Sequence, residues 1–374
     1  MTEFVAERRG DLYALRTMRG LARVVIRTGR LKHRNLMPHA LKYAAWAVRP
    51  GGRILVRDDA PDVYDLWPHF VSFKIMRQWT FKLLAPYAAP VRLDVASREI
   101  ELERTAPPTP PGWGAGVVFS GRAEERPRLL ACVESLLRQP ELRPENGGEI
   151  VVSGPAAAAD CVTGHRSIRY HAFEMPPGAR VMIGRKKNDL IRQLRGPRVI
   201  VMHTRISLGE RCLANVLPEF EVATPRVMAE GGGKAVDYLS LGVHDSGLTG
   251  YAPERVPCNL RRMPARRWLD LYRLGAPYID GGVFMVRRDV HAACPLHDEV
   301  AWDEGEDLEW SHRLLAAGFL LDLAPDAAAR SSVNNLRSTG LPAGAEWLAR
   351  AAKFGAYAFG HRMRHHLDML LGRR

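Results

Sequence analysis

Cysteine is scarce in this sequence. Five cysteines occur among 374 residues, at Cys132, Cys161, Cys212, Cys258 and Cys294. Their number is odd, their spacing is wide and no two form a CxxC pair, so neither a dense disulfide framework nor a cysteine zinc motif is expected. We therefore expect free thiols in a reducing cytosol.

Long apolar runs are also missing. No stretch approaches the roughly 20 apolar residues needed to cross a bilayer, and the Arg-rich N-terminus has no apolar core before a small-residue cleavage site. These features favour a cytoplasmic protein. Nucleic acid is not an expected partner, because no aromatic-basic platform or recognition motif accompanies the positive charge.

The net charge of +13 is concentrated at the two ends. Residues 1–34 contain nine Lys or Arg against three acids, and residues 337–374 contain seven against two. Both ends have a helical pattern of apolar residues. Two interpretations of residues 337–374 stay open. One is a basic amphipathic helix that lies on the anionic inner face of a membrane or binds an acidic partner, and the other is a core-packing helix with a solvated cationic face.

Proline divides the chain. Residues 106–112 contain four prolines and end in glycine, a stiff segment that suits neither a helix nor a central strand. We interpret it as a linker between an N-terminal segment, residues 1–105, and a larger domain, residues 113–336. Residues 337–374 would follow as the basic C-terminal helix.

An acidic stretch near the C-terminus is the most informative part of the sequence. Residues 302–314 place five carboxylates beside Trp302 and Trp310 and continue as a helical pattern that ends at Gly318. The N–H groups and dipole of a helix start stabilise carboxylates at Glu306 and Asp307, so one of them could accept a substrate proton. Trp302 and Trp310 offer flat apolar surfaces for a sugar ring. The alternative is an acidic helix cap with core tryptophans.

Upstream of this stretch, Asp280 precedes a Gly281-Gly282 turn that leads into an alternating strand ending near Arg288. Paired glycines allow a backbone to approach a ligand closely. Earlier, a strand followed by a loop at residues 115–121 and strand patterns at 149–154 and 198–202 are separated by helical patterns at 128–137 and from 184 onward. Ligands bind at the carboxyl ends of such strands.

This order of a Gly-Gly turn, a strand, an acidic loop and a helix resembles the acceptor half of nucleotide-sugar glycosyltransferases of the GT-A fold. With the upstream strands, the resemblance covers roughly residues 112–330. It implies a Rossmann-like α/β domain of the spore-coat nucleotide-diphospho-sugar transferase type. In inverting members the Asp of the Glu-Asp pair is the usual general base, which implies that role for Asp307 with Glu306 as its neighbour.

The resemblance also implies binding residues. Beside the donor sugar and acceptor it places Asp280, Gly281 and Gly282. In the donor site it places Ser120, Gly121 and Ser153 at the nucleotide, and Lys187, Asn188, His203, Thr204 and Arg205 near the diphosphate.

The sequence departs from the family at the metal motif. Where the family has an aspartate-rich segment, this chain has His203-Thr204-Arg205, which offers no carboxylate to Mg²⁺ or Mn²⁺. Two interpretations follow. Either Arg205 replaces the cation as a planar, permanently charged partner for phosphate oxygens, or the site is inactive. Metal dependence therefore stays open.

Residues 1–105 resemble the second half of a class I S-adenosylmethionine-dependent methyltransferase. The patterns predict helices over 34–47 and 62–84, a turn at 48–52, a strand at 53–57 and a hairpin of 91–95 with 98–104. No Gly-rich loop occurs upstream, and we expect the first thirty or so residues to be too few for a cofactor-binding βαβ unit. We therefore expect no S-adenosylmethionine binding, and Asp58, Asp59 and Asp62 to be loop and cap residues.

The function expected from these features is inverting glycosyl transfer, from a nucleotide-sugar to a hydroxyl of a glycan or lipid-linked acceptor, in the synthesis of surface glycans or glycoconjugates. The alternative is a catalytically inactive, transferase-like scaffold that binds a nucleotide-sugar without turnover.

Overall fold

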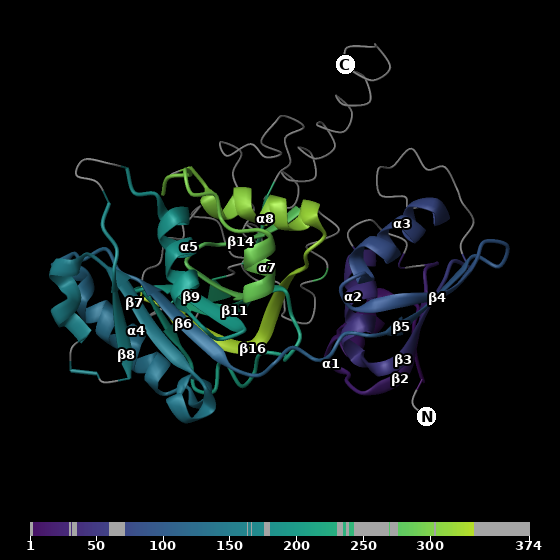
Figure 1. Ribbon diagram of the computed structural model, residues 1–374, viewed down its shortest axis with the longest axis horizontal. Helices are drawn as coiled ribbons and strands as arrows, with labels where there is room; N and C mark the ends of the chain where they lie inside the picture. The colour runs from purple at the N-terminus through teal and green to yellow at the C-terminus, as the bar shows by residue number, and fades with distance from the viewer. Residues whose placement is uncertain are drawn as a thin grey trace, which may run out of the picture. The chain divides into compact units, whose positions relative to one another are not determined.

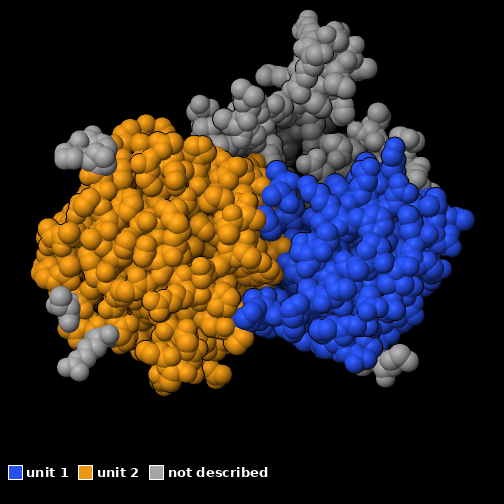
Figure 2. Space-filling model, viewed as in Figure 1, with its two compact units in different colours: residues 1–110, 217–219, 315–320 blue, residues 111–216, 220–314, 321–374 orange. Residues whose placement is uncertain are grey.

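A computed structural model describes most of the chain up to Ser332. The described residues are 3–29, 31, 36–59, 72–162, 164–165, 167–175, 180–229, 235–236, 239–242, 269, 276–302 and 304–332. The predicted C-terminal helix, Asp62 and Cys258 lie outside them. Two compact units are present: unit 1 comprises residues 1–110, 217–219 and 315–320, and unit 2 the rest (Figure 2). The division after Pro110 falls within the Pro-rich segment.

Unit 1 contains a mixed sheet with the strand order β1-β2-β3-β5-β4 (Figure 1). The first three strands pair in parallel, and the last two form an antiparallel hairpin against β3. The bounds are β1 (Glu3–Ala6), β2 (Leu21–Arg27), β3 (Val48–Arg57), β4 (Ala88–Asp94) and β5 (Glu99–Arg104). The predicted strand at 53–57 and the terminal hairpin are therefore confirmed. The predicted turn at 48–52 is wrong, because β3 begins at Val48 and these residues belong to the strand.

Three helices connect the strands of unit 1: α1 (Arg9–Thr17), α2 (Met37–Ala47) and α3 (Phe73–Leu84). Every residue of α2 apart from Pro38 is buried, as expected of a helix rich in Ala and aromatic residues. Helix α3 begins after Ser72, whose side chain accepts a hydrogen bond from the Ile75 amide at 3.3 Å. The described part of the predicted 62–84 helix is thus helical from Phe73 onward.

The N-terminal residues correct one prediction. Residues 3–27 form a complete β1-α1-β2 unit, in which the two strands pair in parallel from Glu3 with Arg23 to Ala6 with Ile26. A four-residue strand and a nine-residue helix make the unit shorter than usual, so thirty residues suffice. Residues 21–27 are a strand, although the pattern favoured a helix. The β1-α1 connection, Glu7-Arg8, contains no glycine.

Asp58 and Asp59 follow β3 and make hydrogen bonds and an ion pair within unit 1. The carboxylate of Asp58 accepts a hydrogen bond from the Thr28 hydroxyl at 2.7 Å and pairs with Arg98, and Asp59 accepts one from the Gly29 amide at 2.9 Å. These contacts join the ends of β2 and β3 to the β4-β5 turn. Asp58 and Asp59 are loop residues, as predicted.

Unit 2 is built on a sheet with the order β10-β16-β11-β15-β9-β6-β7-β8 (Figure 1). The strands β9, β6, β7 and β8 are parallel, whereas β15 runs antiparallel to β9. The bounds are β6 (Trp113–Val118), β7 (Glu149–Gly154), β8 (Ile168–Ala172), β9 (Arg198–His203), β10 (Ile206–Leu208), β11 (Val222–Ala229), β15 (Val283–Arg287) and β16 (Leu321–Ser331). Short strands β12 (Ala235–Val236), β13 (Leu239–Gly242) and β14 (Ala276–Ile279) complete the described set.

Helices cover opposite faces of β6. Alternate β6 residues from Trp113 to Val117 share a core with the apolar side of α4 (Arg126–Leu137). On the other face, α5 (Ile183–Gln193) approaches so closely that a Cβ at Gly116 would lie 2.8 Å from the Leu190 side chain. Helices α7 (Arg288–Ala293) and α8 (Glu306–Ala317) follow β15.

Helix α8 begins at Glu306 and ends before Gly318, as predicted, and Gly318 has the positive φ of +89° that favours glycine after a helix. Among the residues with assigned positions, no helix combines the length and apolar character needed to cross a membrane.

Candidate active site

The candidate site lies at one edge of the unit 2 sheet. The parallel strands β6, β7 and β9 end there, and β15 begins there because it runs in the opposite direction. The His203 amide at the end of β9 donates a hydrogen bond of 3.0 Å to the Gly282 carbonyl just before β15. This contact brings His203-Thr204-Arg205, the predicted diphosphate-binding triplet, next to the Gly-Gly turn, although 79 positions separate His203 and Gly282 in sequence.

Gly281 contacts three of the predicted site residues. Its amide donates to Asp307 Oδ2 at 2.8 Å, and its carbonyl accepts from Lys187 Nζ at 2.9 Å. A Cβ at this position would lie 2.6 Å from Glu306 Oε1 and 2.7 Å from Lys187 Nζ. A larger side chain here would therefore push the ends of Glu306 and Lys187 aside. The predicted close approach of this turn to a ligand stays a prediction.

Asp307 lies in the first turn of α8 and is half-buried. Burial, reinforced by the nearby carboxylates of Glu306 and Asp280, raises its pKa to about 7, against the lowering effect of the Gly281 amide. A carboxylate with a pKa near 7 is suited to accept a proton at neutral pH.

Glu306 has a different environment. Its side chain is 7% exposed and its Oε1 lies 2.8 Å from Lys187 Nζ, which is itself fully buried. The pair joins the start of α8 to α5. Glu306 therefore neutralises a buried cation, and Lys187, predicted to bind the diphosphate, is enclosed by protein groups in this structure.

The Arg205 guanidinium faces Asp280, the residue before the Gly-Gly turn. Its Nη2 lies 3.8 Å from Asp280 Oδ1, and its Nη1 lies 3.3 Å from His203 Nδ1. Asp280 in turn accepts a hydrogen bond from the Gly282 amide at 2.9 Å. Arg205, His203 and the predicted sugar-side residues thus form one cluster.

His203 is buried and stays neutral. Burial, followed by the charges of Lys187, Arg205 and Lys186, lowers its pKa well below the ordinary value for histidine. Since Nδ1 faces the Arg205 guanidinium, the proton of the neutral ring belongs on Nε2. Among the described residues Nε2 has no hydrogen-bond partner.

Ser153 presents a second buried polar atom without a partner in the described ranges, its Oγ. Ser153 pairs with Val118, which pairs with His203, so the three lie side by side across adjacent parallel strands. Buried polar groups are normally satisfied, which marks these two positions as candidates for ligand contact.

Ser120 and Thr204 converge on one carboxylate. The Ser120 amide and the Thr204 hydroxyl each lie 3.4 Å from Glu125 Oε2. Gly121 adopts a positive φ of +86°, and a Cβ there would lie 2.7 Å from Pro155. The predicted nucleotide-side residues are therefore held at the same sheet edge.

Sequence reasoning missed Lys186, the residue before Lys187. Its Nζ donates to the Phe119 carbonyl at the end of β6 at 2.6 Å, and the side chain is 7% exposed. Burial lowers its pKa to about 8. In the sequence the two lysines are equivalent, and only the packing of α5 on the sheet distinguishes them.

Trp302 lies beside the cluster. It is 51% exposed and stacks on His203 with ring centroids 5.0 Å apart. Trp310, in contrast, is 1% exposed, packs against Phe284 and donates to the Cys294 carbonyl at 2.7 Å. This placement corrects the prediction for Trp310: the tryptophan is a core residue and presents no face to a sugar.

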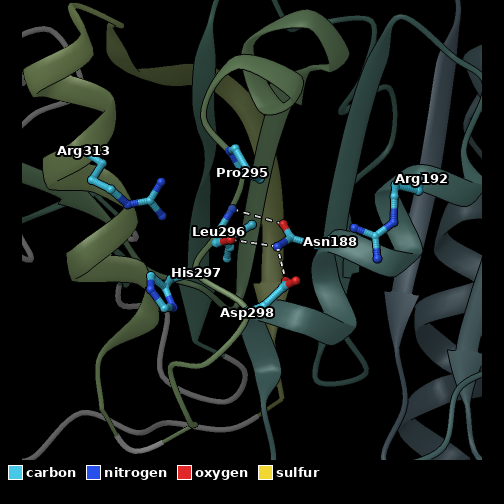
Figure 3. Close-up of a pocket in the computed structure, with 7 residues that line it drawn as sticks. All are labelled: Asn188, Arg192, Pro295, Leu296, His297, Asp298 and Arg313. Carbon is cyan, nitrogen blue, oxygen red and sulfur yellow. Dashed lines mark hydrogen bonds between the residues drawn. The ribbon is translucent and has the colours of Figure 1, made fainter.

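Asn188 also lies apart from the cluster. Its amide nitrogen donates to the Leu296 carbonyl and to Asp298, and its oxygen accepts from the Leu296 amide (Figure 3). The same oxygen also contacts His291 Nε2 at 2.8 Å. These contacts use the whole hydrogen-bonding capacity of the side chain, which corrects its assignment to the diphosphate. A pocket of about 340 Å³ adjoins it. The pocket is lined by Asn188, Arg192, Pro295, Leu296, His297, Asp298 and Arg313.

The chemistry of the cluster does not fit a divalent cation. In the described ranges no group of three or more His, Cys, Asp or Glu side chains could hold a metal ion. At the position where the sequence resemblance implied a metal motif, the Arg205 guanidinium faces the Asp280 carboxylate. No step proposed below passes through a metal.

Comparison with known proteins gave no sequence relatives: no family model and no curated protein matches the chain. Among the solved structures that share some similarity with this chain are three complexes. GalNAc-T7 with UDP, GalNAc and Mn²⁺ has 14% identity and a TM-score of 0.44, over 62% of this chain and 45% of that one. TarS 1–349 from S. aureus with UDP-GlcNAc has 12% identity and a TM-score of 0.41, over 62% and 61%.

The third is the mannosyltransferase PcManGT from Pyrobaculum calidifontis with GDP-Man and Mn²⁺. It has 14% identity and a TM-score of 0.37, over 68% of this chain and 64% of that one. This chain thus spans less than two-thirds of each of these proteins. TM-scores below 0.5 do not establish a shared fold, so the function is inferred from the residues of this chain.

Proposed function

We propose that this protein is an inverting glycosyltransferase that moves a sugar from a nucleotide-sugar to a hydroxyl of a glycan or lipid-linked acceptor. The observation that carries the proposal is Asp307, a half-buried carboxylate at a helix start with a pKa near 7, held by Gly281 at the edge where parallel strands end. The proposal that unit 2 has a GT-A fold rests on the sequence resemblance and on the position of Asp307 beside the ends of the parallel strands.

In the proposed reaction Asp307 takes the proton of the acceptor hydroxyl. The resulting oxygen nucleophile forms a bond to the anomeric carbon on the face opposite the leaving group, and the bond from that carbon to the nucleoside diphosphate breaks with inversion. The leaving group carries away the electron pair. A base with a pKa near the working pH is efficient in such a step.

Departure of the diphosphate needs positive charge and hydrogen-bond donors at the phosphates. Arg205 provides a planar guanidinium, and the adjacent His203 provides an Nε2–H without a partner among the described residues. Together they would offer phosphate oxygens a charged and a neutral donor at the position of the missing metal motif.

The competing function is a non-turnover nucleotide-sugar binder or scaffold. The feature that favours it is the burial of both Lys186 and Lys187, which leaves Arg205, with 18% of its side chain exposed, as the more accessible cation of the cluster. Unit 1 fits either function as a methyltransferase-like remnant, because its sheet ends in the hairpin order β3-β5-β4. For residues 337–374, both a basic amphipathic helix and a core-packing helix stay predictions.

Asp307→Asn separates the two functions. For a transferase we expect transfer to fall by about a thousandfold or more while nucleoside diphosphate affinity stays within about twofold, because the base acts in the chemical step. Asp326→Asn is the matched control, since Asp326 is an exposed carboxylate in β16 of the same unit. Equal transfer by Asp307→Asn and the native protein would remove Asp307 from the role.

A further inference from the structure

Lys187 is a buried cation without access to solvent. Its side chain is 0% exposed, and its ammonium contacts the Gly281 carbonyl at 2.9 Å and Glu306 at 2.8 Å. The ring centroid of Phe284 lies 5.7 Å from Nζ. A buried ammonium is costly unless it is paired, so Glu306 is required as its counter-charge.

The contacts of Lys187 connect three segments of the chain around the Gly281 peptide. Lys187 comes from α5, Gly281 from the turn before β15, and Glu306 from the start of α8. Lys187 holds the oxygen of Gly281, and the amide nitrogen of Gly281 donates to Asp307 Oδ2 at 2.8 Å. The other oxygen of Asp307 accepts from the Leu308 amide at 2.8 Å. The carboxylate is thus oriented by backbone groups on both sides.

Resting on the glycosyltransferase function proposed above, we infer that Lys187 is a positioning residue: together with Glu306 it holds the Gly281 peptide against Asp307 and so sets the orientation of the base, without contacting the donor. The sequence resemblance implied a donor diphosphate contact for the same lysine. The enclosed ammonium and its two protein partners support the positioning role instead.

If Lys187 and Glu306 position Asp307, their removal should also change the pKa of Asp307. The charged groups that face Asp307 are Glu306 on its own helix, Asp280 in the turn and Lys187 on α5. Glu306 raises the pKa of Asp307 more than Lys187 lowers it. Removing Lys187 alone should therefore raise the Asp307 pKa further, whereas removing Lys187 and Glu306 together should lower it.

The test compares Lys187→Met with the double variant Lys187→Met/Glu306→Leu in the full chain. The double variant replaces the ion pair by apolar groups and carries the test if the single variant does not fold. Lys74→Met, an exposed lysine in α3, is the matched control. Three quantities are measured: kcat, the Kd of nucleoside diphosphate, and the titration midpoint of the Asp307 carboxyl carbon by ¹³C NMR, assigned with Asp307→Asn.

We expect both variants to lose at least about tenfold in kcat, because the base is misplaced, with Kd changed less than about twofold. The Asp307 midpoint should move up by about one pH unit in the single variant and down in the double variant. A Kd weakened by about tenfold or more with kcat unchanged would make Lys187 a donor ligand and overturn the inference. So would an unchanged Asp307 midpoint in whichever variant folds.

The outcomes distinguish this inference from the proposed function. A native protein that neither binds nor turns over any nucleotide-sugar contradicts the proposed function. The NMR midpoints still decide whether Lys187 and Glu306 control Asp307, because they need no substrate.

Discussion

The amide of Gly281 donates a hydrogen bond to Asp307 Oδ2 over 2.8 Å, although 26 positions separate the two residues. This contact links the Gly-Gly turn to the helix that follows the acidic loop. It places the candidate base beside Asp280, Gly281 and Gly282, the residues predicted to surround the donor sugar.

The first prediction concerns pH. A base must be ionised to accept a proton, and the pKa of Asp307 is raised to about 7. We expect kcat for transfer to rise with pH, to reach half its maximum near pH 7 and to level off above it. Steady-state rates from pH 5 to 9 check this; a rate already maximal at pH 5 would show that a carboxylate with an ordinary pKa, or no base, controls the step.

The second prediction concerns stability. A carboxyl with a folded pKa near 7 and an ordinary unfolded pKa binds more protons in the folded state between these values. Its contribution to stability therefore falls as pH rises through that window. We expect the Tm of Asp307→Asn relative to the native protein to be more favourable at pH 8 than at pH 5. A difference that does not change with pH would contradict the raised pKa.

The third prediction concerns Arg205. Arg205→Ala should weaken nucleoside diphosphate affinity by about tenfold or more, since a charge-assisted hydrogen bond is lost. Arg205→Lys should restore only part of it, because an ammonium lacks the planar fork. Calorimetric titration measures both, with Arg143→Ala, at an exposed arginine of unit 2, as the control. Unchanged affinity in Arg205→Ala would exclude Arg205 as the substitute for a metal.

The fourth prediction tests the fold of unit 2. A Cβ at Gly196 would lie 2.5 Å from the Gly114 amide nitrogen, a backbone atom that cannot move aside alone. Gly196→Ala should destabilise the unit by about 2 kcal/mol or more. At Gly164 no atom of the residues that the structure describes, chain neighbours aside, lies within 4 Å of such a Cβ, so Gly164→Ala should change stability by less than about 0.5 kcal/mol. Equal midpoints in denaturant would contradict the packing of β6.

Local patterns predicted much of unit 2. Strand β7 has the predicted bounds, β9 extends the prediction by one residue, and α8 begins at Glu306 as its acidic first turn indicated. Each of these elements has a periodicity or a capping signal of its own. The β1-α1-β2 unit did not stand out, because its first strand has four residues and the Arg-rich pattern of residues 1–34 suggested a helix.

Sequence patterns identified the segments that form the site, but not which side chains contact one another or are buried. Gly281 and Asp307 were singled out by the glycine pair and the acidic helix start, and the structure places them in contact. The burial of Lys187 and Trp310 was not predictable, because it depends on the packing of α5 and α8 against distant strands. Side chains with the same local pattern, such as Lys186 and Lys187, differ only in that packing.

The measurement that tests the central claim most directly is transfer from a panel of nucleotide-sugars by the native protein and Asp307→Asn, each with EDTA and with Mn²⁺. Hydrolysis to water serves as the readout until an acceptor is found. We expect saturable binding of at least one donor, slow turnover by the native protein in EDTA, and loss of that turnover in Asp307→Asn with binding retained. Absence of binding to every donor, or turnover that Asp307→Asn preserves, would contradict the account.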